Sequence, residues 1–128
     1  MLLFHQSNRT RTSWDDLPRQ LAAAGINTLT IDERGYGESG GTKEARELYH
    51  DGDLEAAFEY LVSQSGVQRD VIGAGGAGWL GVDNSVETAR RHSAEMKSLV
   101  LMSGETLLPR LRFLRQASQL PGAVRRVR

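Results

Sequence analysis

Strand-like and helix-like segments alternate along this 128-residue chain, and the alternation constrains the fold more than any single motif does. Short runs rich in apolar and β-branched residues predict four strands, at residues 1–5, 27–32, 70–74 and 97–103. Segments with helical spacing follow them, at residues 14–24, 43–65, 84–92 and 110–120. This order is typical of α/β proteins, in which right-handed crossovers join parallel strands and helices cover the sheet. We therefore predict an α/β fold with a four-stranded, mostly parallel sheet and flanking helices.

Capping residues predict where the helices begin. Ser13 is the expected N-cap of the first helix, and Asn84 or Ser85 that of the third. The second helix is expected to break near "HDGD", where Asp51 or Asp53 would cap its second part. The apolar face predicted for this helix consists of Leu54, Ala57, Phe58 and Leu61. Pro121 and Gly122 are expected to end the last helix.

The composition excludes several classes of function. The 16 basic and 16 acidic residues give a formal net charge of zero, so there is no electrostatic reason to expect nucleic acid or an anionic membrane as a partner. The absence of cysteine excludes disulfides, thiolate metal sites and a cysteine nucleophile. No apolar run approaches the roughly 18 residues of a membrane span, and the apolar start is too short for a signal peptide. We expect a cytoplasmic protein without a cofactor or a metal ion.

The chain has the length of one ordinary domain, which we place at residues 1–122, followed by a basic tail at residues 123–128. In open parallel sheets, ligands bind beyond the carboxyl ends of the strands. The loops that hold Gln6, Arg34, Gly75 and Glu105 follow predicted strands. The sequence therefore predicts a site at this edge of the sheet.

A glycine-rich turn at residues 70–81, "DVIGAGGAGWLG", has two interpretations. Gly73, Gly75 and Gly78 have the G-x-G-x-x-G spacing of dinucleotide-binding loops, with Glu105 as the acidic residue after the next strand. That acid lies 105 − 78 = 27 positions beyond Gly78, whereas such loops place it about 20 residues on. The stretch "WLGVDNS" is also expected to delay the helix that should begin at the glycines. Binding of NAD or FAD is therefore the alternative interpretation.

A second motif favours the other interpretation. "IDERGYGESGG", residues 31–41, closely resembles the D-x-R-G-x-G-x-S segment after the fourth strand of α/β-hydrolases. "LLFH" and "SWDDLPRQLAAAGINTLTID" are similar to the segments before it, and "VIGAG" and "MKSLVLMSGE" to those after it, in the same order. The resemblance extends to about Gly122. It implies a partial core of a family of serine hydrolases that act on ester or amide bonds.

The resemblance fails at the catalytic positions. The G-x-S-x-G motif of the family's nucleophile elbow places its serine at Gly75, or nearer Trp79 if the alignment is anchored downstream. Neither residue can attack a carbonyl carbon, which excludes covalent acyl transfer there. The histidine base should come late in the chain, yet the histidines are His5, His50 and His92. His50 is expected on a helix surface, and His92 at a helix end where a cation suits the dipole.

Other polar residues have structural interpretations. Backbone N–H groups of Gln6, Ser7 and Gly76 correspond to the family's oxyanion hole, although Gln6 replaces its common glycine. Arg34 and Ser39 are expected to shape the loop after the second strand. Asp83 and Ser85 are better explained as a helix cap than as catalytic residues, and no histidine is placed to complete a metal site with Asp83 and Glu105. The sequence leaves open whether Trp79 and Leu80 are buried or exposed.

The chain resembles only the third to sixth strands of the family's sheet, so we expect a truncated and catalytically inactive hydrolase-like protein, a pseudoenzyme. Sheet edges that are paired in the family would be exposed here. This predicts marginal stability or self-association through those edges. A small carbonyl or anionic compound is the expected ligand at the strand ends, and a non-catalytic interaction module is a further alternative.

Overall fold

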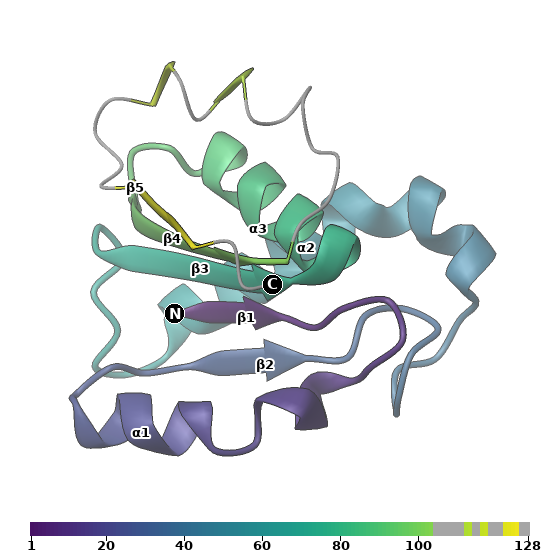
Figure 1. The fold of residues 1–128 in the computed structure, drawn as a ribbon, viewed down its shortest axis with the longest axis horizontal. Helices are drawn as coiled ribbons and strands as arrows, with labels where there is room; N and C mark the ends of the chain where they lie inside the picture. The colour runs from purple at the N-terminus through teal and green to yellow at the C-terminus, as the bar shows by residue number, and fades with distance from the viewer. Residues whose placement is uncertain (104–111, 114–115, 118–121, 126–128) are drawn as a thin grey trace.

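The computed structural model of the chain describes residues 1–103, 112–113, 116–117 and 122–125. Its strands form one parallel sheet in the order β2-β1-β3-β4-β5 (Figure 1). They are β1 (Leu2–Phe4), β2 (Leu29–Ile31), β3 (Ile72–Ala77), β4 (Met96–Met102) and β5 (Gly122–Arg125). The predicted α/β class and the four predicted strands are confirmed. The fifth strand, β5, lies in a segment from which the sequence predicted a helix stop and a tail.

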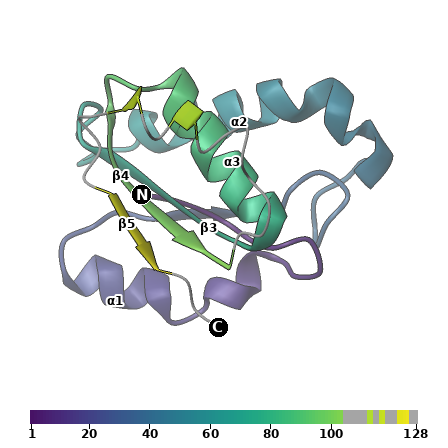
Figure 2. The same ribbon diagram turned by 45° about the horizontal axis from the view of Figure 1, so that its top comes forward.

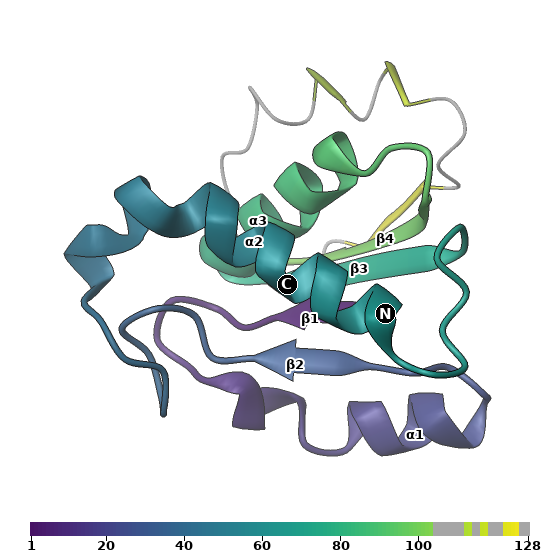
Figure 3. The same cartoon turned by 180° about the vertical axis from the view of Figure 1, so that it is seen from behind.

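The helices lie mainly on one face of the sheet. Helices α2 (Arg46–Ser63) and α3 (Gly78–Arg91) lie in front of the sheet when the molecule is seen from behind (Figure 3). An oblique view shows α3 lying over β3 and β4 (Figure 2). The short α1 (Leu17–Ala23) lies beside the edge strand β2. Within residues 1–103, two 3₁₀ turns accompany these helices, η1 (Arg11–Trp14) and η2 (Lys43–Ala45).

The first helix differs from the prediction. It is divided into η1 and α1, and its N-cap is Asp16 without a side-chain cap, not Ser13. Pro18 explains the division, because proline lacks an N–H and fits only in the first turn of an α-helix. Gly25 follows the helix with φ of +79°, as expected of a C′ glycine.

Helix α2 is continuous through "HDGD", which corrects the predicted break there. The acids expected to cap a second helix instead form tertiary ion pairs, Asp53 with Arg34 and Asp51 with Arg91. The predicted apolar face of α2 is buried, as expected. It packs on Leu2, Phe4, Ile72 and Met96 of the sheet in one continuous core.

Helix α3 begins at Gly78, not at the predicted cap Asn84 or Ser85. Asp83 and Ser85 therefore lie inside the helix and not at its N-terminus. The hydroxyl of Ser85 donates to the carbonyl of Gly81 one turn earlier, at 2.8 Å. Polar residues that suggested a helix start by composition are instead buried within the helix.

Two predictions fall largely outside the described residues. Glu105 is not among them, and of the predicted helix at 110–120 only residues 112–113 and 116–117 are described. In the part of the chain that is described, no helix is both long and apolar enough to cross a membrane.

Candidate functional site

The carboxyl ends of β1 and β3 meet where the strand order changes direction. Strand β1 neighbours both β2 and β3, so the chain crosses over at this point. Gln6 follows β1, and Gly78 follows β3. A Cβ atom added to Gly78 would lie 2.7 Å from the Cβ of Gln6. The structure therefore brings these two sequence-predicted loops together at the switch point, where open α/β sheets bind ligands.

The sharp strand-to-helix turn lies at Gly78. This residue has φ of +66°, directly between the last residue of β3 and the rest of α3. The two positions predicted for the nucleophile slot are both corrected. Gly75 is inside β3, opposite Leu3 and Val100, and Trp79 is already in the first turn of α3. The tip of the turn is Gly78, which neither alignment with the hydrolase motif places at the nucleophile position.

Close packing explains the other glycines of the turn. A Cβ on Gly76 would lie 1.9 Å from the carbonyl oxygen of Gly81, and a Cβ on Gly81 would lie 2.4 Å from that of Phe4. Gly76, Gly78 and Gly81 thus repeat the G-x-G-x-x-G spacing three residues after the predicted set. Gly73 and Gly75 of the predicted set are strand residues. The sequence contains this spacing twice, and only packing distinguishes the two.

The backbone N–H groups predicted as oxyanion-hole donors lie in different kinds of structure. Gly76 pairs with Phe4 on one side and Leu101 on the other, so its backbone belongs to the sheet ladder. Gln6 and Ser7 lie in the loop after β1. Trp79, which the prediction did not include, lies in the first turn of α3, where N–H groups have no intrahelical acceptor. The Trp79 side chain is 52% exposed while Leu80 is buried, which settles the question left open by the sequence.

The loop after β2 is structural, as the sequence indicated. The Asp32 carboxylate accepts hydrogen bonds from the backbone N–H groups of Arg11 and Glu38, at 2.7 and 3.0 Å. The Ser39 hydroxyl donates to the Asp32 carbonyl. Burial opposes ionisation of Asp32, but the backbone hydrogen bonds and the Arg11 guanidinium outweigh it, and the pKa of this carboxyl is lowered. Arg34 is bound to Asp53 by two hydrogen bonds.

The three histidines are engaged in structural contacts. His5 is buried, and its Nε2 accepts the N–H of Glu33 at 3.1 Å, so its Nδ1 donates to the Gln6 carbonyl. His92 caps α3, pairs with Glu55 and stacks on Phe58. The predicted surface position of His50 is wrong. Its side chain is only 13% exposed and lies 2.6 Å from Asn84 Oδ1.

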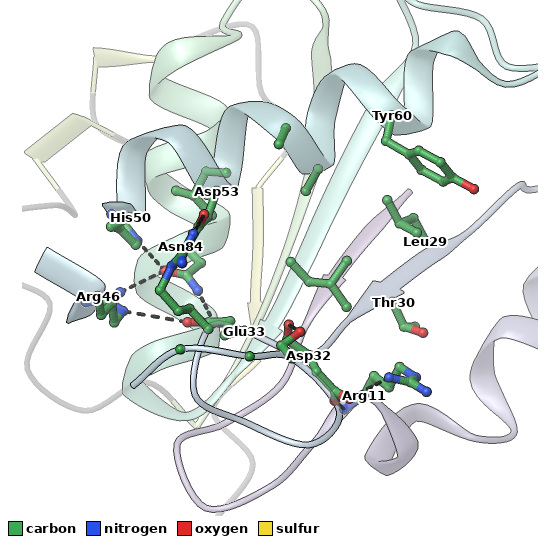
Figure 4. Close-up of a pocket in the computed structure, with 18 residues that line it drawn as sticks. Arg11, Leu29, Thr30, Asp32, Glu33, Arg46, His50, Asp53, Tyr60 and Asn84 are labelled. Carbon is green, nitrogen blue, oxygen red and sulfur yellow. Dashed lines mark hydrogen bonds and ion pairs between the residues drawn. The ribbon is translucent and has the colours of Figure 1, made fainter. Parts of the chain in front are cut away.

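A cavity of about 850 Å³ lies between β2 and α2, close to the same edge of the sheet (Figure 4). One end is lined by Leu29, Ile31, Leu54 and Ala57, and the other by polar side chains. A cluster of buried and half-buried polar residues closes the polar end. It consists of Glu33 after β2, Arg46 and His50 on α2, and Asn84 on α3.

Asn84 organises this cluster. Its amide nitrogen donates to Oε1 of Glu33, and its amide oxygen accepts from Arg46 at 2.9 Å and from His50. The other carboxylate oxygen, Oε2 of Glu33, lies 3.6 Å from Arg46 Nε. Burial raises the pKa of Glu33 to about 7, even though the nearby Arg46 cation favours ionisation. A buried carboxyl that titrates near neutral pH beside a cavity is a recognised mark of a functional site.

The sequence did not identify Glu33, Arg46 or Asn84 as site residues. The one available signal was the acidic pair Asp32-Glu33 at the end of a strand. Asp32 accepts a hydrogen bond within the loop, and Glu33 belongs to the polar cluster. The sequence predicts Asn84 as a helix cap because it precedes a helical pattern. Its inward position follows only from the early start of α3 at Gly78.

Within the described part of the chain, no group of three or more His, Cys, Asp or Glu side chains is arranged to hold a metal ion. Comparison with known proteins finds no matching family model and no curated protein with significant similarity.

Proposed function

We propose that this protein is an α/β-hydrolase-like protein that binds a small carbonyl compound or an anion at the carboxyl edge of its sheet without hydrolysing it. The observation that carries the proposal is Gly78, which occupies the tip of the strand-to-helix turn with φ of +66°. In serine hydrolases of this architecture a serine stands at that tip, in a strained backbone conformation. A glycine keeps the turn without strain and provides no attacking oxygen.

The surroundings of the turn support binding without turnover. The base required to activate a nucleophile would be a histidine near Gly78. His5 is the histidine closest in sequence to the Gln6 loop, and both of its ring nitrogens are occupied by backbone partners. The first turn of α3 still presents backbone N–H groups and the positive end of the helix dipole, which attract a carbonyl oxygen or an anion.

The test is labelling with a fluorophosphonate probe, which reacts covalently with activated serines. We expect no adduct on the native protein by intact-mass spectrometry and no protein-dependent hydrolysis of p-nitrophenyl esters. A heat-denatured sample is the control for non-specific labelling. An adduct that forms on a serine only in the native protein would refute the proposal.

Dinucleotide binding is a second candidate, favoured by one specific observation. Gly76, Gly78 and Gly81 carry the G-x-G-x-x-G spacing, and α3 begins directly at Gly78. A pyrophosphate requires a helix N-terminus in this position. A thermal-shift titration with NAD, NADP and FAD distinguishes the two candidates. Stabilisation by a dinucleotide that Gly78→Ala abolishes would favour this second function, and no shift at millimolar concentrations would exclude it.

A further inference from the structure

The charges that line the cavity between β2 and α2 are balanced within the protein. Three arginines line it, and each of them lies beside an aspartate. The N–O distances are 2.5 Å for Arg11–Asp32, 2.6 Å for Arg34–Asp53 and 3.4 Å for Arg46–Asp83, so the balance does not depend on the charge of Glu33. An ionic ligand would have to displace an internal partner or lose its hydration without compensation. The cavity therefore favours an uncharged ligand.

The shape and the apolar lining of the cavity set the size of that ligand. Leu29, Ile31 and Leu54 contribute apolar side chains at one end. Ala56 and Ala57 of α2 leave space where larger residues would fill it. A volume of about 850 Å³ lies within the range of roughly 300–1,000 Å³ found for small-molecule sites.

One oxygen of the Glu33 carboxyl group has no partner at normal hydrogen-bond distance among the described residues. Its Oε1 accepts from Asn84, whereas its Oε2 lies 3.6 Å from Arg46 Nε, too far for a normal hydrogen bond. Arg46 Nε is itself buried and has no hydrogen-bond partner in the described part of the chain. When Glu33 carries a proton, Oε2 is the oxygen left to hold it, and the acid becomes a donor.

We propose that the cavity between β2 and α2 binds a small neutral molecule with an apolar body and a carbonyl oxygen, and that this oxygen accepts a hydrogen bond from the carboxylic acid of Glu33. The inference rests on the proposed function in that it takes the protein to bind a carbonyl compound without turnover. It places this ligand in a second site, because Gly78 is not among the residues that line the cavity. It also excludes an anion there and identifies Glu33 as the residue that recognises the carbonyl.

Several groups face Glu33 from the elements packed around it. They are Arg46, His50 and Asp53 on α2, Asp83 on α3, Tyr36 in the loop after β2, and His5 after β1. Burial is the largest influence on Glu33, Asp83 and Asp53 add to it by repulsion, and Arg46 opposes it. The pKa of Glu33 is thereby about 7, so the free protein holds the donor form below neutral pH and loses it above.

The experiment is calorimetric titration of the full chain with three ligands of one carbon skeleton. The neutral ligand is 2-heptanone, which accepts hydrogen bonds, donates none and cannot be hydrolysed. Heptanoate and heptylamine are its charged counterparts. We expect only the ketone to bind at about pH 6, and its affinity to fall about thirtyfold by about pH 8.5, because binding requires the protonated acid. Failure of the ketone to bind, equal affinity at both pH values, or equally tight binding of heptanoate would overturn the proposal.

Three variants test whether the pH dependence of ketone binding comes from Glu33 and whether the ketone binds in the cavity. Glu33→Gln keeps a donor at every pH, so we expect ketone binding to lose its pH dependence. Glu38→Gln is the matched control, because Glu38 is exposed and does not line the cavity, and it should retain the thirtyfold change. Ala56→Trp fills the cavity from an exposed helix position and should abolish binding. Unchanged binding in Ala56→Trp, or loss of binding at both pH values in Glu33→Gln, would contradict the assignment.

These outcomes are independent of the test of the proposed function. Hydrolysis of an ester, or labelling by a fluorophosphonate, would refute the non-catalytic function and leave the ketone titration unchanged. Absence of a pH-dependent ketone site would refute the inference alone.

Discussion

Residues at this edge of the sheet have one of two roles. Some stabilise a loop, and others are placed to bind a ligand. The neighbours Asp32 and Glu33 illustrate the division. Asp32 faces backbone N–H groups, which lower its pKa, whereas Glu33 faces a poorly hydrated cluster, which raises its pKa. Adjacent residues of similar chemistry thus have opposite environments, because the chain turns between them toward different partners.

Glu33 makes the stability of the protein depend on pH. Its pKa rises from 4.5 to about 7 on folding, so the folded state binds the proton more tightly. The higher pKa of Glu33 therefore adds to the free energy of unfolding at low pH. This contribution is at most roughly 3 kcal/mol, is fully present below pH 4.5, and is lost as the pH rises through about 7. Glu33→Gln should remove that slope. Urea unfolding of both proteins between these pH values measures it, and parallel curves would contradict the assignment.

Asp32 should be essential for the loop after β2. In Asp32→Asn an amide nitrogen, which is a donor, would replace an oxygen that accepts hydrogen bonds from Arg11 or Glu38. At least one hydrogen bond would be lost, together with the ion pair to Arg11. We expect unfolding to become easier by about 2–4 kcal/mol at neutral pH. Asp16→Asn is the control, since Asp16 is exposed and makes no capping bond, and should change stability by less than about 0.5 kcal/mol.

At the scale of elements, the site of the proposed function is formed by β3, the turn at Gly78 and α3. The close approach of helix and strand depends on two glycines whose added methyl groups would strike backbone atoms. Gly76→Ala should therefore destabilise the protein by at least about 3 kcal/mol, because backbone cannot move aside as a side chain can.

A glycine in α2 provides the comparison. Gly52 is exposed, and an added Cβ would meet nothing within 4 Å. Gly52→Ala should stabilise the protein by about 0.5–1 kcal/mol through helix propensity alone. Thermal unfolding of the two variants measures both effects. A neutral Gly76→Ala would show that α3 does not pack on β3 as closely as described.

Elements with strong local patterns were predictable, and elements set by tertiary contacts were not. Strands β1 to β4 follow from runs of apolar residues and the buried face of α2 from helical spacing, and these were predicted from the sequence, whereas β5 was not. The start of α3 was missed because "WLGVDN" has glycine and polar residues in a helix, and these positions are explained only by packing on β1 and by the buried cluster around Asn84. The division of the first helix follows from Pro18, because a proline fits only in the first turn of an α-helix.

At the scale of the whole molecule, burial is distributed unevenly over the layers. Helix α3 contains an unbroken buried run at residues 80–89, whereas α1 has no buried residue. Val100 on β4 remains 44% exposed. The core is thus concentrated on the side of the sheet that α2 and α3 cover.

Local opening should follow this distribution. We expect backbone amides of α1 to exchange with deuterium far faster than those of α3, because opening α1 exposes little buried surface. Native-state hydrogen exchange followed by mass spectrometry measures the two segments in one sample. Equal protection of α1 and α3 would show that α1 is held by contacts that its exposure does not reveal. Self-association through the sheet edges stays a prediction, and it would add protection at β2.

The central claim is that the turn at Gly78 retains the geometry of a catalytic elbow without the ability to hydrolyse. Real-time proton NMR of ethyl butyrate mixed with the full chain tests it most directly, since the spectrum follows the ester and its products together. We predict that butyrate and ethanol appear no faster than in buffer. Release of butyrate in proportion to the protein concentration would contradict the account.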